Sequence, residues 1–117
     1  MSENEDCIFC KVVRGKLPAY IVYKDDFVTA FHDINPQAPV HVLIVPTRHI
    51  ADLEAAAQED PELVGRMSQA ATRIAGDLHV AKNGYRLVLN NGAGAGQIVP
   101  HVHMHMMAGR KFNWPPG

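Results

Sequence analysis

Two kinds of hydrophobic pattern along the chain predict where strands and helices lie. Segments rich in β-branched, aromatic and aliphatic residues predict strands. There are five such segments, at 20–25, 27–33, 41–46, 85–90 and 99–107. The first two are expected to form a hairpin. Pro100 stands near the start of the last, where the missing N–H costs least.

Apolar residues spaced three and four apart predict one long helix. They are Leu63, Met67, Ala70, Ile74 and Leu78. Asp60 is the expected N-cap, and Pro61 fits the first helical position. A short helix is expected at 50–57, and a helical turn before Gly15. This order of elements predicts an α+β fold, a five-stranded antiparallel sheet with one long and one short helix.

Composition and charge narrow the class of protein. The 117 residues suit a single domain spanning 1–117, and 47% of them are apolar, enough for an ordinary core. The net charge is −1 without a basic block, so no nucleic acid partner is expected. The apolar runs are too short to span a membrane, and residues 1–6 look flexible rather than like a signal peptide. We therefore expect a cytoplasmic protein with reduced thiols.

The stretch HVHMHMM places His101, His103 and His105 at a spacing of two. On a strand, this spacing would direct all three rings to one face. Imidazole titrates near physiological pH and is also a common metal ligand. Two neighbouring rings can share an ion, but three in line cannot easily do so. The stretch therefore predicts a metal site, an acid–base or nucleophilic site, or both on one strand.

Two further segments carry candidate chemistry. Cys7 and Cys10 stand in CIFC, which is compatible with a redox pair, half of a metal site, or two small buried side chains. The loop NNGAGAGQ leads into the histidine stretch. Its glycines would let backbone N–H groups approach an anion, although such a loop is also typical of a mobile connection.

Several motifs together resemble one family. HVHMHMM fits the signature His-x-His-x-His followed by two apolar residues, and it is accompanied in order by matching segments over nearly the whole chain. These segments are CIFCKVVRGKLPA, FHDINPQAPVHVLIVP, GYRLVLNNG, GQIVPHVHMHMM and WPPG. The chain thus resembles the Hint branch of the histidine triad (HIT) family. The resemblance implies the HIT-like fold and a two-fold homodimer in which the sheet continues across the subunits. The tail 112–117 would bring Trp114 to the leaving-group side of the partner's site.

The resemblance also implies a reaction. The family cleaves the P–N bond of purine nucleoside 5'-phosphoramidates, releasing AMP or GMP and an amine. His103 would be the nucleophile and would form a nucleotidyl-histidine. His105 and His41 are candidates for the acid that protonates the leaving amine. His101 is the fourth member of the catalytic set, and no magnesium is expected. The alternatives are a zinc-containing nucleotide-binding or interaction module with incidental hydrolysis, and a diadenosine polyphosphate hydrolase.

Binding residues carried over from the family fall into three groups. Phosphate would meet Asn90 and the backbone of Gly96, Gln97 and Val99, and ribose would meet Asp33. The purine slot would be formed by Ile8, Phe9, Phe31, His32, Ile34 and Leu43. Ile98 stands where the family commonly has a hydroxyl residue, so one hydrogen bond is lost and turnover could fall by up to about 10²–10³.

The resemblance also implies a structural zinc site. Cys7, Cys10, His49 and His101 would form a closed Cys2His2 set. The alternative is that the thiols pack as small apolar groups and His101 only bonds a backbone group.

Overall fold

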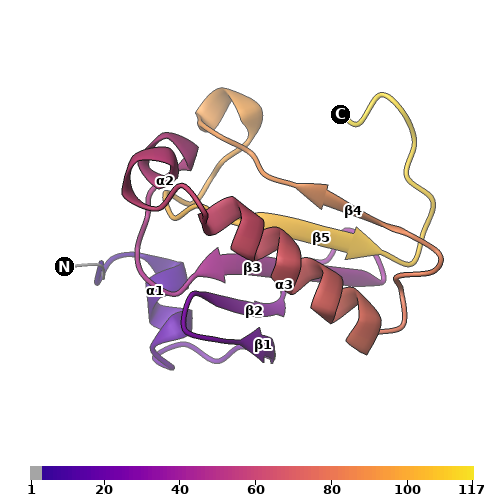
Figure 1. Cartoon of the computed structure of the whole chain (residues 1–117), viewed down its shortest axis with the longest axis horizontal. Helices are drawn as coiled ribbons and strands as arrows, with labels where there is room; N and C mark the ends of the chain where they lie inside the picture. Colours follow the sequence, from indigo (N-terminus) through magenta and orange to yellow (C-terminus); the bar gives the residue numbers. More distant parts are fainter. Residues whose placement is uncertain (1–3) are drawn as a thin grey trace.

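The computed structural model describes residues 4–117, and it contains one five-stranded antiparallel sheet (Figure 1). Its strands are β1 Ile21–Lys24, β2 Val28–His32, β3 Val40–Pro46, β4 Tyr85–Val88 and β5 Met104–Ala108. They lie in the order β1-β2-β3-β5-β4. The predicted α+β class and five-stranded antiparallel sheet are confirmed.

Strand β3 is the centre of the sheet because it is apolar on both faces. Its residues from His41 to Pro46 are buried. The two outer strands, β1 and β4, are half-buried or exposed along their length. The register of β3 with β5 pairs Leu43 with His105 and His41 with Met107, so two histidines from distant parts of the sequence lie on neighbouring strands.

Helix α3 (Leu63–Asp77) lies across one face of the sheet (Figure 1). The predicted apolar stripe forms the core, with Leu63, Met67 and Ile74 almost fully buried against β2 and β3. The predicted start of the helix is wrong. Asp60 accepts the Leu63 N–H through its backbone carbonyl and pairs its carboxylate with Arg66, so the chain makes a turn before the helix begins. The N-cap position falls on Glu62, whose side chain makes no capping bond.

Two shorter helices are present, one near the predicted short helix and one at the predicted helical turn. Helix α2 (Leu53–Glu59) begins later than the expected 50–57, because the Asp52 carboxylate accepts the N–H of Ala55 and caps it there. Helix α1 (Ile8–Val13) is the expected turn before Gly15. It is anchored in a second apolar cluster with Phe31, Leu43 and Val45 of the sheet.

Strand β5 begins at Met104, so the prediction of a strand over 99–107 is wrong in its first half. His101 and His103 lie in the segment that enters the strand, outside the ladder. The Val102 N–H bonds the Ile50 carbonyl instead of a strand partner. The three histidines are therefore not evenly placed on one strand face, and the backbone of His101 is available for other contacts.

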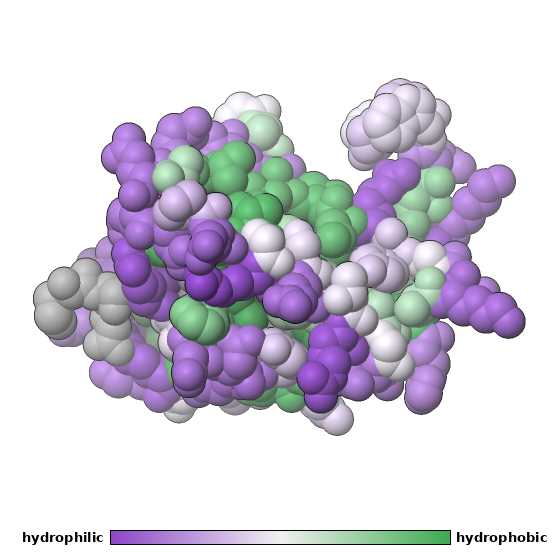
Figure 2. Space-filling model, viewed as in Figure 1, coloured by the Kyte–Doolittle hydropathy of each residue, from purple (hydrophilic) through white to green (hydrophobic). Residues whose placement is uncertain are grey.

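The stripe on α3 is used within the chain. Ala70, Ala71 and Ala75 are buried against the sheet together with the large residues of the stripe. These alanines are therefore part of the core of the single chain. Strand β4 is half-buried and, among the described residues, pairs with a strand on one side only. An apolar area is visible on the face of the molecule shown in Figure 2.

The two ends of the chain differ. Residues 1–3 lie outside the described part, and residues 4–6 form a turn in which the Asn4 carbonyl accepts the Cys7 N–H. The C-terminal segment leaves β5 and runs out past β4 (Figure 1), with Trp114 83% exposed. Within residues 4–117, none of the helices has the length and apolar character needed to cross a membrane.

Candidate functional site

A cleft of about 610 Å³ opens between α1, the strands β2 and β3, and the segment 96–99 that leads to the histidines. Most residues predicted to bind nucleotide line it. They are Ile8, Phe9, Phe31, His32, Asp33, Ile34, Leu43, Gly96, Ile98, Val99, His103 and His105. The structure therefore brings the predicted base, ribose and phosphate groups to one cavity.

The ring of His103 is oriented by a nearby backbone carbonyl. Its Nδ1 lies 2.9 Å from the carbonyl oxygen of His101. A carbonyl can only accept, so Nδ1 carries a proton, and in the neutral tautomer the lone pair is on Nε2. The Phe9 ring meets the imidazole edge-on, with centroids 5.1 Å apart, and this contact further restricts the ring. This orientation would leave Nε2 as the nitrogen that can act on a ligand.

A second chain of hydrogen bonds fixes His41 and His105. The backbone N–H of Gln37 donates to Nδ1 of His41 over 3.0 Å, so His41 carries its proton on Nε2. That Nε2 lies 2.9 Å from Nδ1 of His105 and 3.4 Å from a carboxylate oxygen of Asp33. His105 must accept at Nδ1, and its own proton is therefore on Nε2. His105 thus presents an N–H donor, in contrast to the free nitrogen of His103.

Burial keeps this pair neutral. Desolvation lowers the pKa of His105 to about 4, helped by the neighbouring His103 and His41 and opposed by Asp33. Desolvation also lowers the pKa of His41, again opposed by Asp33. Both rings are neutral at pH 7, in agreement with the hydrogen-bond pattern.

The loop predicted to meet phosphate is braced from within. The Gln97 side chain donates to the carbonyls of Ala51 and Val99 and accepts the Gly92 N–H. Its side-chain amide is therefore committed to the loop, and its backbone N–H is also used there, because it donates to the Gly92 carbonyl over 3.1 Å. Nδ2 of Asn90 lies 3.9 Å from the place of a Cβ on Gly96, so the predicted amide donor is beside this loop.

Two isoleucines border the mouth of the cleft. Ile34 is 95% exposed and Ile98 is 90% exposed, although both line the cavity. Together they place apolar surface at the edge of the cavity. Ile98 presents an apolar surface where a hydroxyl was expected in the family.

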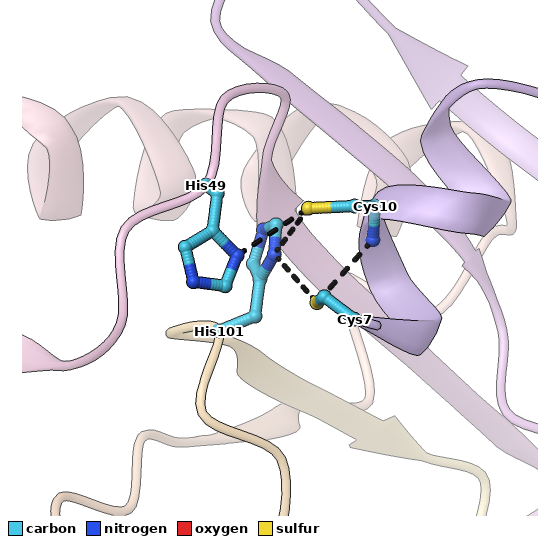
Figure 3. A group of neighbouring side chains, drawn as sticks. All are labelled: Cys7, Cys10, His49 and His101. Carbon is cyan, nitrogen blue, oxygen red and sulfur yellow. Dashed lines mark hydrogen bonds between the residues drawn. The ribbon is translucent and has the colours of Figure 1, made fainter. Parts of the chain in front are cut away.

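A separate cluster joins Cys7, Cys10, His49 and His101 (Figure 3). The thiols come from the start of α1, His49 from the segment after β3, and His101 from the segment before β5. Nδ1 of His101 lies 3.3 Å from Sγ of Cys7 and 3.5 Å from Sγ of Cys10. Nδ1 of His49 lies 3.3 Å from Sγ of Cys10. The predicted four residues thus converge.

This geometry fits a tetrahedral ion. Bond lengths of about 2.3 Å to sulfur and 2.05 Å to nitrogen separate the ligand atoms by roughly 3.5 Å. The sulfur–nitrogen distances of 3.3 and 3.5 Å are of this size. Nε2 of His101 donates to the Pro46 carbonyl over 2.9 Å, which leaves Nδ1 as the ligating nitrogen. The four residues are positioned to hold a metal ion.

A third group, Asp33, His41 and His105, has polar atoms as close together as those of a metal site. An ion there would need the Nε2 lone pair of His41. The Gln37 N–H already occupies Nδ1, so Nε2 bears the proton and cannot ligate without breaking that bond. This group is better described as a hydrogen-bonded relay.

Some cleft residues were missed by the sequence prediction. Val12, Leu17, Pro18 and Ala19 also line the cavity. Val12 lies in α1 and the other three in the segment that leaves it, and as small or aliphatic residues they carry no chemical signal of their own. The sequence offered one clue to them, namely that Ile8 and Phe9 of α1 were themselves predicted to line the cleft.

Comparison with known proteins agrees with this geometry. Residues 14–112 match the HIT domain family. The chain belongs to the HIT family. It is 50% identical over 113 residues to an uncharacterized HIT-like protein of Synechocystis sp., covering 97% of this chain and 98% of the relative.

Two further HIT relatives extend the comparison. The purine nucleoside phosphoramidase of Escherichia coli K12 is 45% identical over 106 residues, covering 91% of this chain and 89% of the relative. The crystal structure of a HIT family hydrolase from Legionella pneumophila superposes with a TM-score of 0.90 at 43% identity, covering 96% of this chain and all of that one (100%). The predicted family is confirmed.

Proposed function

We propose that this HIT protein hydrolyses the P–N bond of purine nucleoside 5'-phosphoramidates, releasing AMP or GMP and an amine. The observation that carries the proposal is the bond from Nδ1 of His103 to the His101 carbonyl, which directs a free Nε2 into the nucleotide-sized cleft. The E. coli relative named purine nucleoside phosphoramidase supports the substrate class.

In the first step, Nε2 of His103 attacks the α-phosphorus. An N–P bond forms while the substrate P–N bond breaks, and the amine leaves with a proton from water. The proton on Nδ1 stays bonded to the His101 carbonyl and stabilises the charge that develops on the ring. In the second step, water attacks the phosphorus and the bond between phosphorus and Nε2 breaks. The attacking water loses a proton to solvent, which balances the proton taken up by the amine, and the nucleotide is released with His103 restored.

His105 acts as a donor to the phosphoryl oxygen. Its Nε2–H is fixed by the relay from Gln37 through His41. If His105 gave up that proton, one ring of the His41–His105 pair would become an imidazolate anion. The relay therefore suits stabilisation of charge on phosphate better than acid catalysis. Asp33, which lines the cleft beside His41, would accept from the ribose hydroxyls.

The metal cluster has a structural role in this proposal. Cys7, Cys10, His49 and His101 would hold zinc, which would tie α1 to the segment that carries His103. Zinc would supply folding energy and take no part in the reaction. The reaction is proposed to proceed without magnesium.

A two-fold homodimer completes the proposal. The uncovered edge strand β4 offers the backbone groups through which a sheet can continue into a second copy. The exposed Trp114 on the projecting tail would then border the leaving-group side of the partner's His103. Light scattering should give about twice the chain mass of 12.9 kDa.

The test is release of AMP from adenosine 5'-phosphoramidate, followed by chromatography. The wild type and His79→Asn should both release AMP, because His79 is an exposed residue with a left-handed backbone (φ 60°) that Asn tolerates. His103→Asn should not. AMP release by His103→Asn would reject the assigned nucleophile, and no release by the wild type would reject the reaction and favour a binding module.

A further inference from the structure

The loop between β2 and β3 is clamped from outside by the residues that follow β5. Arg110 donates from Nε to the carbonyl oxygen of Gln37 over 2.9 Å, although the two residues are 73 positions apart. Gly109 has φ +95°, and a Cβ there would lie 2.8 Å from Cβ of Pro39. The close approach of Gly109 to Pro39 thus brings Arg110 against the loop.

Gln37 uses both of its backbone groups in this arrangement. Its carbonyl accepts from Arg110, and its N–H donates to Nδ1 of His41. The other bonds of the loop are local. The N–H of Asn35 donates to the Asp33 carboxylate, and the side chain of Gln37 donates to the Asn35 carbonyl. These local bonds shape the turn, whereas Arg110 connects Gln37 to the body of the protein.

The guanidinium of Arg110 is itself held in place. It stacks on the Phe112 ring at 4.3 Å and donates to the Lys111 carbonyl. Arg86 contacts the same ring, at 5.1 Å, and donates to the Asn113 carbonyl. Arg86 therefore shares the tail contacts of Arg110 without the bond to Gln37, which makes it a matched control.

We propose that Arg110 is a positioning residue for the histidine relay. Through the backbone of Gln37, Arg110 holds the proton of His41 on Nε2 and therefore the proton of His105 on Nε2, facing the cleft. The catalytic consequence rests on the function proposed above, but the tautomers themselves do not. Without the clamp, Gln37 moves away from His41, and both rings become free to exchange their protonated nitrogens.

The experiment reads the tautomers directly in substrate-free protein. Two-bond ¹⁵N–¹H correlation spectra of ¹⁵N-histidine protein show which ring nitrogen carries the proton. In the wild type and Arg86→Ala, His41 and His105 should both be protonated on Nε2. In Arg110→Ala, both should show mixed tautomers, with kcat for phosphoramidate lowered about tenfold and KM within about twofold.

Two other variants sharpen the result. Arg110→Lys keeps the charge without the Nε–H and should resemble Arg110→Ala. Gln37→Pro removes the N–H that meets His41 and should give mixed tautomers with Arg110 intact, so it tests the relay separately from the clamp. Arg110→Lys tests the clamp even if Arg110→Ala folds poorly. Unchanged tautomers in folded Arg110→Ala, full recovery by Arg110→Lys, or an equal effect of Arg86→Ala would overturn the proposal, and unchanged tautomers in Gln37→Pro would overturn the relay through which Arg110 acts. Loss of wild-type activity with the expected tautomers would reject only the proposed reaction.

Discussion

Removing the metal ligands should lower the free energy of unfolding, and the structure sets limits on the size of this loss. In the double variant Cys7→Ser, Cys10→Ser, both thiolate ligands are lost from a cluster whose members come from three separate segments. The fold would not collapse, because α1 is also held by Phe9 and Val12 in the second apolar cluster. The effect should therefore be that of losing a bound ligand from a protein that still folds.

The size of the effect follows from linkage. An ion present at 100 to 1,000 times its dissociation constant stabilises the folded state by about 2.7–4.1 kcal/mol. Each kcal/mol shifts Tm by roughly 4 °C for a chain of this size. The double variant should thus melt about 10–16 °C below the zinc-loaded wild type.

The assay is differential scanning calorimetry combined with elemental analysis. Wild type purified without chelator should contain about one zinc per chain, and removing it with a chelator should lower Tm to that of the double variant. The chelator should leave the double variant unchanged, which controls for other effects of the reagent. Zinc-loaded and zinc-free wild type with the same Tm would refute the structural role, and wild type without metal would refute the site.

Four further outcomes are expected. His103→Ala should lower kcat by at least a hundredfold while nucleotide binding by calorimetry stays within about tenfold, and substantial residual turnover would reject the assignment. The pKa of His105, held near 4 in the folded protein, should make stability fall as pH drops from about 6.5 to 4, because the unfolded chain binds the proton first. Urea titrations of His105→Gln should show a smaller fall, by up to about 1.4 kcal/mol per pH unit, and equal slopes would contradict this. Ile98→Ser should raise kcat, by up to about 10²-fold if the new hydroxyl bonds the transition state, and steady-state rates that do not rise would exclude that role. Deleting residues 112–117 should leave the mass in light scattering unchanged but alter kcat/KM between small and bulky amine substrates, and an unchanged ranking would leave Trp114 without a role in the site.

Side-chain patterns were sufficient to predict the sheet and the long helix, whereas the residues that line the cleft were predicted through the family resemblance. The buried stripe of α3 and the apolar run of β3 are strong signals in the sequence, because packing of the core requires apolar residues at these positions. The two Cys–His pairs of the metal cluster could be anticipated only through the family resemblance, since Cys7 and His49 are far apart in the chain.

Features that depend on the backbone could not be predicted. Asp60 has the residue type of an N-cap, but its pairing with Arg66 belongs to a turn that precedes the helix. The alternation of HVHMHMM suggested a strand throughout, whereas only Met104 and later residues enter the ladder. The Gln37 N–H, which sets two tautomers, is a group that every residue except proline possesses, so the sequence carries no mark of it.

The double use of His101 has an evolutionary consequence. Its imidazole faces the metal cluster, but the group that orients His103 is its main-chain carbonyl, which any amino acid at this position would provide. The two centres meet at His101 and yet depend on different groups of that residue. A lineage could discard Cys7, Cys10 and His49 as a set, replace the imidazole at 101, and still keep a competent nucleophile, provided that packing around α1 compensates for the lost ion. We therefore expect metal-free descendants of this architecture to be accessible by few substitutions, whereas no comparable substitution at position 103 leaves the chemistry in place.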